Sequence, residues 1–454
     1  MVLRSVCFVF FLVMTGCVST GVRTPDYASG LDGTDAEMPF NRAGESSSRQ
    51  AEIELLLEKS EIGLEDLLRI AELNNPEVRA AWNDVGAAAG RAWQAEFYPN
   101  PNLEFEAEGI PASEVGLGHS ENKVAIVQPV ILGGRRSAAV SAASVERDSR
   151  SLLVQSKLRE VQSELQRIHV ELVYLKQAIV LHSELGDIAQ ETLRVARTRF
   201  DAKAAPESEV IKAQIDVHEL GLSRRRLDRL LTASSEQLTS LLGGVRVPVE
   251  IIGGRLPGEL PELDIHRLQV AVRERHPAVL AAEKNVEVAN HRIDEAKAER
   301  IPDIGVRLAY GRDAATDEDL IEVGISIPLP LFNRNQGRIL ESRHLASKAK
   351  RDAESLVNNL LSELAMWRAS YMTACDEVET LQRQIVPAAE RAFQQTKEGY
   401  QAGKIGFLDL LDAQRTLTRG QFSLLESVKD MNVARAKLWK IVGREIEERP
   451  ISEE

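Results

Sequence analysis

The segment Tyr400–Gln414 reads YQAGKIGFLDLLDAQ, and it lies between two long stretches of helical sequence. A weaker copy, FDAKAAPESEVIKAQ, occupies residues 200–214. Self-similarity at such a distance indicates that a whole architecture has been duplicated. Both segments are therefore predicted to be the tips of long helical hairpins, and the rest of the chain supports them.

The stretches that lead into the tips, 135–201 and 334–401, have apolar residues that recur at steps of three and four, which is heptad packing. At 1.5 Å per residue, each helix is about 100 Å long. The apolar seams consist of Leu158, Val161, Leu165, Ile168, Leu172, Leu175 and Ile179 in the first stretch, and of Leu360, Leu364, Trp367, Tyr371, Ala374, Val378, Leu381 and Ile385 in the second.

Shorter helical patterns return from the tips at 207–243 and 408–443, and others precede the strands at 64–97 and 263–300. Each is about half as long as a tip-forming helix. Two short helices are therefore predicted to stack end to end against one long helix, twice per chain. The expected units are a first repeat, 63–243, a connector, 244–262, a second repeat, 263–443, and a tail, 444–454.

Strand pairs are predicted at 102–130 and 303–328, because these segments alternate apolar and polar residues with a period of two. Segments of this kind, about ten residues long, are typical of membrane β-barrels. Glu104, Glu106 and Glu108 share one face of the first strand. With the apolar face in lipid, they would line a pore. Solvation of one side of a water-soluble sheet is the alternative.

Four strands cannot close a membrane barrel, because open edges leave unpaired backbone groups that cost several kcal/mol each, and closed barrels begin at about eight strands. If the strands face lipid, several chains must share one barrel. Three chains would supply 12 strands at four per chain, but the heptad pattern does not fix the number. The predicted fold class is mostly α with membrane β: duplicated helical hairpins that form an α-barrel, plus four strands per chain in a shared barrel.

Residues 1–16 have the features of a signal peptide, with Arg4 ahead of a short apolar run and Thr15-Gly16 before Cys17. This pattern is similar to a bacterial lipobox, which predicts that the mature chain starts at a lipidated Cys17. Several acyl chains would anchor it stably. An ordinary signal peptide is the alternative. Residues 17–62 are predicted to be a flexible tether.

The net charge of −13 argues against nucleic-acid binding. The eight histidines are scattered, no two of them have metal-ligand spacing, and there is no Cys-x-x-Cys motif or Met cluster, so neither a metal site nor a cofactor is expected. No nucleophile or phosphate-loop motif is present, so catalysis is not expected.

Four motifs carry a family resemblance: Asn75-Pro76-Glu77, Tyr98-Pro99-Asn100-Pro101, Gln128-Pro129 with Gly133-Gly134-Arg135-Arg136, and Pro328–Gly337, which reads PLPLFNRNQG. With the duplicated order of elements, they resemble the TolC-type outer-membrane factor family of tripartite export pumps, in its heavy-metal (cobalt–zinc–cadmium) branch. The resemblance implies a homotrimer, a twelve-stranded barrel, and a helical tunnel into the periplasm of a Gram-negative bacterium. It also implies a periplasmic adaptor and an inner-membrane pump as partners.

The resemblance also implies roles at the tips. Asp409 and Asp412 match positions that form carboxylate rings at the periplasmic aperture of the tunnel, although Asp is also favoured at a helix start. Their counterparts in the first repeat are Glu209 and Lys212. The expected adaptor contacts, which could equally be plain interhelical turns, are Ala202, Lys203, Ala204, Ala205, Pro206, Gly403, Lys404, Ile405, Gly406 and Phe407.

The function predicted from the sequence is a passive outer-membrane exit duct for heavy-metal cations. A coiled-coil adaptor lipoprotein is one alternative, but such proteins have one hairpin and no paired membrane strands. An exit duct for drugs or polypeptides on the same scaffold is another.

Overall fold

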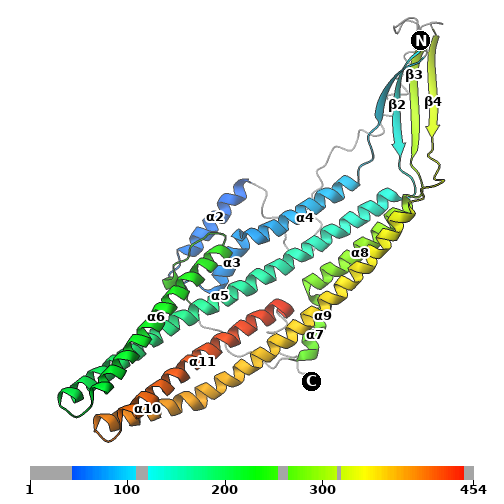
Figure 1. The fold of residues 1–454 in the computed structure, drawn as a ribbon. Helices are drawn as coiled ribbons and strands as arrows, with labels where there is room; N and C mark the ends of the chain where they lie inside the picture. Colours follow the sequence, from blue (N-terminus) through cyan, green and yellow to red (C-terminus); the bar gives the residue numbers. More distant parts are fainter. Residues whose placement is uncertain (1–42, 109–120, 254–263, 314–317, 444–454) are drawn as a thin grey trace, which may run out of the picture. The chain divides into compact units, whose positions relative to one another are not determined.

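The computed structural model describes residues 43–108, 121–253, 264–313 and 318–443 (Figure 1). The chain divides into two units, 1–51 and 52–454. Except for the N-terminal part of α2, all the elements belong to the second unit. The predicted lipidation site, Cys17, lies outside the described residues, so the lipid anchor remains a prediction.

The elements of the first repeat and its leader are α2 (Ala43–Leu57), α3 (Leu64–Asn74), α4 (Pro76–Ala95), β1 (Asn102–Glu108), β2 (Glu121–Val130), α5 (Arg135–Asp201) and α6 (Glu207–Leu241). A short 3-10 turn, η2 (Val249–Ile251), follows. The second repeat consists of α7 (Ile265–Arg275), α8 (Pro277–Ala298), β3 (Ile304–Asp313), β4 (Glu318–Ser326), α9 (Gln336–Thr380), a π turn labelled η3 (Leu381–Ile385), α10 (Val386–Gln401) and α11 (Phe407–Val442).

The helices predicted at 64–97 and 263–300 are each split in two. Asn75 and His276 precede prolines and have extended backbones, because proline disfavours the helical conformation of the residue before it. The Asn75 side chain accepts hydrogen bonds from the backbone N–H groups of Glu77 at 2.8 Å and Val78 at 3.1 Å. His276 Nδ1 accepts one from Ala278 at 3.2 Å. Each residue therefore ends one helix and caps the next.

The segment predicted as a tether contains the helix α2, which the low hydrophobicity of its first half conceals. Ile53, Leu56 and Leu57 pack against the core formed by α3 and α5. Glu52 also accepts hydrogen bonds from the Arg69 guanidinium, the shorter one 2.7 Å long. This end of the leader is thus held by contacts with the first repeat.

The tip-forming helix of the first repeat, α5, is continuous, whereas that of the second repeat is interrupted by the π turn. Buried positions follow the predicted seam as far as Val378 and then resume at Ala389 and Phe393. Leu381 is half-buried and Ile385 is exposed, contrary to the heptad expectation. The π turn contains one residue more than an α-helical turn, and this shifts the buried face.

Each repeat packs as predicted, with short helices along one long helix (Figure 1). In the first repeat α4 and α6 lie along α5, and in the second α8 and α11 lie along α9. The two repeats also contact each other, because α8 and α11 both pack on α5. A separate hydrophobic core joins the two hairpin tips, and its members include Ala196, Phe393, Tyr400 and Phe407.

The four strands form one antiparallel sheet in the order β1-β2-β3-β4. The pair β2–β3 joins the two repeats, with Ala125 opposite Ala309. The outer strands, β1 and β4, each have one edge without a partner strand among the described residues. The four connections between sheet and helices lie at the same end of the sheet (Figure 1).

Candidate functional site

The sheet has one apolar and one charged face. Apolar side chains on the first face are exposed to an unusual degree, with Phe105 at 75% and Val323 at 74%. Its exposed members are Leu103, Phe105, Val124, Val306, Leu308, Tyr310, Ile321, Val323 and Ile325. Monomeric soluble proteins rarely expose a contiguous apolar surface of this kind. The opposite face carries the predicted pore-lining residues Glu104, Glu106 and Glu108.

Lys123 lies at the centre of the charged face, with only 8% of its surface exposed. Its Nζ contacts carboxylate oxygens of Glu322 at 2.7 Å, Glu121 at 3.2 Å and Glu108 at 3.3 Å. Gly311 lies opposite Lys123, and a Cβ there would lie 2.8 Å from Lys123 Cγ. The glycine therefore leaves room for the lysine stem.

Arg307 forms a second group of ion pairs on the same face. Its guanidinium contacts carboxylates of Glu106, of Glu322 at 3.5 Å and of Glu104 at 3.6 Å. The two groups of ion pairs thus combine five carboxylates, from Glu104, Glu106, Glu108, Glu121 and Glu322, with two cations, which gives these groups a net charge of −3. By the strand register, Glu318 is a further carboxylate on this face.

Sequence reasoning found the three glutamates of β1 and missed the two cations. Lys123 and Arg307 belong to strands that were predicted from their alternating apolar and polar residues. The two-residue period of a strand therefore already places both side chains on the polar face. Which carboxylates they contact depends on the register of β2 against β1 and β3, and a single strand carries no such information.

Asp409 and Asp412 are both exposed near the start of α11, three residues apart. Three-residue spacing places them on neighbouring positions of one helix face. Gly406 caps this helix with an extended backbone, and a Cβ there would lie 3.2 Å from an Asp409 carboxylate oxygen.

The two turns have matching backbones. Gly403 and its counterpart Lys203 both adopt left-handed conformations, with φ of +72° and +56°. Most of the predicted adaptor contacts are exposed, but Ala205 and Ile405 are half-buried and Phe407 is buried. Phe407 packs on Tyr400, with ring centroids 5.8 Å apart, so it supports the turn from inside.

Tyr400 connects the two hairpins, and sequence reasoning missed this role. Its hydroxyl donates to Glu209 Oε2 at 3.2 Å. Arg199 lies 4.4 Å above its ring and donates to its carbonyl oxygen at 2.9 Å. Burial, together with the Glu209 carboxylate, raises the pKa of the Tyr400 hydroxyl to about 12. Residues 199 and 209, on α5 and α6, thus hold the end of α10.

A second contact between the hairpins lies one to two turns further from the tips. Gln414 donates to Asp216 Oδ2 at 3.0 Å, and its amide oxygen accepts from the Thr192 hydroxyl at 3.4 Å. All three side chains are buried. Burial raises the pKa of the Asp216 carboxyl, and the nearby Arg415 guanidinium opposes this shift.

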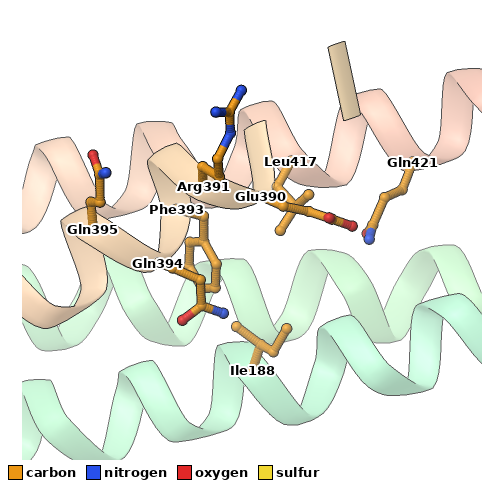
Figure 2. A pocket seen from close by; sticks show the side chains of 8 residues that line it. All are labelled: Ile188, Glu390, Arg391, Phe393, Gln394, Gln395, Leu417 and Gln421. Carbon is orange, nitrogen blue, oxygen red and sulfur yellow. The ribbon is translucent and has the colours of Figure 1, made fainter. Parts of the chain in front are cut away.

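An open hollow of about 500 Å³ adjoins these contacts, between α5, α10 and α11 (Figure 2). Figure 2 shows Phe393 of α10 directed toward Ile188 of α5, with Leu417 beside them. The hollow is lined by these apolar groups together with glutamine, glutamate and arginine side chains. Its lining contains no cluster of groups suited to catalysis or to metal coordination.

Within the described ranges, His, Cys, Asp and Glu residues nowhere gather into a group of three that could hold a metal ion. Among the helices that the structure describes, none is both long enough and apolar enough to cross a bilayer.

The sequence matches the family described as "Outer membrane efflux protein" over residues 67–244 and 268–444. The two matched segments are the two repeats. They cover most of the chain, and the chain belongs to this family.

The chain is 28% identical over 393 residues to the cobalt-zinc-cadmium resistance protein CzcC of Cupriavidus metallidurans, covering 84% of this chain and 90% of that protein. It is 25% identical over 307 residues to the nickel and cobalt resistance protein CnrC of the same species, covering 64% and 69% of the two chains. These likenesses confirm the family and the heavy-metal branch that the motifs indicated.

Among solved structures, the fold is similar to that of CusC, a transmembrane channel, with a TM-score of 0.70 and 17% identity over 84% of this chain and 92% of the other. The outer membrane protein VceC of Vibrio cholerae gives a TM-score of 0.69 and 18% identity, covering 84% and 96%. The predicted fold class is therefore confirmed. The match to the outer membrane efflux protein family confirms the prediction that the protein is not an enzyme.

Proposed function

We propose that three copies of this chain form the outer-membrane exit duct of a tripartite efflux pump, and that the duct conducts heavy-metal cations. The observation that carries this proposal is the two-faced sheet, with an exposed apolar face and a charged face whose ion-pair groups have a net charge of −3. Lipid suits the first face and a water-filled lumen suits the second.

The unpartnered edges of β1 and β4 support the assembly. In a bilayer, the backbone groups at these edges need partners, and β4 of one copy can pair with β1 of the next. Repeating this contact three times closes a ring of 12 strands, which is well within the size range of membrane barrels.

The negative charge of the lumenal face supports a cationic cargo, because rings of carboxylates favour cations in a pore. Asp409 and Asp412 would add two further rings at the tips, where they act as the periplasmic aperture. The names of CzcC and CnrC, which refer to resistance to divalent metals, agree with such a cargo. The turn residues 202–206 and 403–406, most of which are exposed, would contact the adaptor, which connects the duct to an inner-membrane pump.

Light scattering and planar-bilayer recording on the detergent-purified chain test this proposal together. We expect the mass of three chains and a conductance that is permeable to cations in preference to anions. A stable monomer without conductance would refute the proposal. Deletion of the gene should lower resistance to zinc, cobalt or cadmium, and lower resistance to hydrophobic drugs alone would assign the duct to organic cargo instead.

A further inference from the structure

The junction between sheet and helices is built from four connectors, which we define as residues 96–101, 131–136, 299–303 and 327–338. They are tied to one another by specific contacts. Gly133 has φ of +70°, and a Cβ there would lie 2.9 Å from the carbonyl oxygen of Ala298. Arg135 and Asp303 form an ion pair at 2.7 Å between the second and third connectors.

The first connector contacts the second, and the fourth connector contacts the third. Asn335, with φ of +59°, donates from Nδ2 to the Ala296 carbonyl and to Glu299, both at 2.7 Å. Arg136 donates to the carbonyl oxygen of Glu96 at 2.9 Å and lies 4.5 Å above the ring of Tyr98. Hydrogen bonds and an ion pair therefore hold the four connectors in defined positions at the junction.

Large apolar side chains project from this surface into solvent, and Phe332 is the most exposed of them at 91%. The others are Phe97, Tyr98, Ile301, Ile327, Leu329 and Leu331. They all belong to the connectors between the sheet and the helices. Aromatic residues at the end of a membrane-facing sheet are typical of the boundary between the hydrocarbon and the headgroups of a bilayer.

The junction is also positively charged in an acidic protein. Five arginines and three carboxylates occur in the four connectors, a net charge of +2, against −13 for the whole chain. Arg300 and Arg334 are exposed, and no ion pair joins either to a carboxylate in the part of the chain that the structure describes. Both flank the contact of Asn335 with the end of α8.

We propose that this junction binds anionic phospholipid, with Arg300 and Arg334 contacting the headgroup phosphate while Phe332 and its apolar neighbours lie among the acyl chains. The inference rests on the proposed function, because it requires the apolar face of the sheet to lie in a membrane. Guanidinium groups pair well with phosphate oxygens. Basic side chains beside a membrane-embedded element are typical of recognition of anionic lipid.

The test compares detergent micelles doped with phosphatidylglycerol or with phosphatidylcholine, using the full-length purified protein. Wild-type protein should gain thermal stability from phosphatidylglycerol and bind it on the order of tenfold more tightly than phosphatidylcholine. Arg300→Gln with Arg334→Gln should abolish most of this preference. Arg225→Gln with Arg226→Gln, which removes two exposed arginines from α6, should retain it.

Equal affinity of the wild type for both lipids would overturn the inference. So would a preference that survives in the Arg300 and Arg334 double variant, or burial of both arginines against a neighbouring copy. Conductance in phosphatidylcholine bilayers separates this result from the proposed function. A conducting protein without lipid preference refutes only the lipid site, and a protein that never conducts refutes the duct.

Discussion

At the scale of single residues, His276 makes the stability of the folded protein depend on pH. Its Nδ1 accepts the hydrogen bond that caps α8, so this nitrogen must be unprotonated. Burial, aided by the charges of Arg159 and Lys440, lowers the pKa of His276 to about 4. Asn75 makes the equivalent cap in the first repeat without a titratable group.

We predict that His276→Asn makes the protein less sensitive to acid. An unfolded histidine binds a proton near pH 6.5, and the folded one does so only near pH 4, so stability falls as the pH decreases through this window. The loss approaches about 3 kcal/mol below pH 4 at roughly 1.4 kcal/mol per pKa unit.

Thermal unfolding at pH 7 and pH 4.5 measures this effect. The difference between the two Tm values should be smaller in His276→Asn than in the wild type, whereas the exposed His218→Asn should not change it. An unaltered difference in His276→Asn would show that the buried imidazole does not control acid stability.

Asp409 and Asp412 give the second prediction at this scale. Replacement of both by Ala should raise the conductance of the duct in planar bilayers, because shorter, neutral side chains widen the aperture and no longer retain cations there. Glu207→Ala removes an exposed carboxylate from the first turn of α6 and serves as the comparison. Equal conductance of wild type and the Asp409 and Asp412 double variant would contradict the aperture role.

At the scale of elements, the end of α10 is held against α5 and α6 through Tyr400. Tyr400→Phe removes the hydrogen bond to Glu209 while the ring keeps its contacts with Arg199 and Phe407. We expect a loss of about 1 kcal/mol in local stability. Amide hydrogen exchange at the ends of α5, α6 and α10 should become faster.

Tyr174→Phe is the control for this variant, since the Tyr174 ring can keep its position 4.9 Å from Lys429. It should leave exchange at the tips as in the wild type. If Tyr400→Phe behaves in the same way, the hydroxyl does not hold the hairpins together.

The long helices and the strand pairs were predictable because their periods extend over many residues. The helices at 64–97 and 263–300 were predicted as single elements, although the prolines that follow Asn75 and His276 are a local signal for a break. Helix α2 was missed because its docking depends on Ile53 and Leu56 meeting a core far along the chain. The ion pairs of Lys123 and the contacts of Tyr400 likewise depend on distant partners.

At the scale of the whole molecule, we predict that the charged face of the sheet determines which ions the duct prefers. Replacing Glu104, Glu106 and Glu108 by Gln would leave two carboxylates and two cations in the ion-pair groups of this face, and so reduce the net charge of these groups from −3 to zero. We predict that the triple variant loses most of the preference for cations.

Reversal potentials in a salt gradient measure this change. Glu58→Gln, Glu65→Gln and Asp84→Asn together remove three exposed carboxylates outside the sheet and should leave the reversal potential unchanged. A triple glutamate variant with the reversal potential of the wild type would mean that these side chains do not face the conducting path.

The π turn at Leu381–Ile385 distinguishes the tip-forming helix of the second repeat from that of the first. Both tip-forming helices step eleven residues between buried positions here, from Ala178 to Ala189 and from Val378 to Ala389, but α5 also buries Leu185 between them, whereas the equivalent Ile385 is exposed. No such turn interrupts α5. The two hairpins therefore differ in backbone geometry at equivalent positions, and a ring built from alternating hairpins would have threefold and not sixfold symmetry at this level.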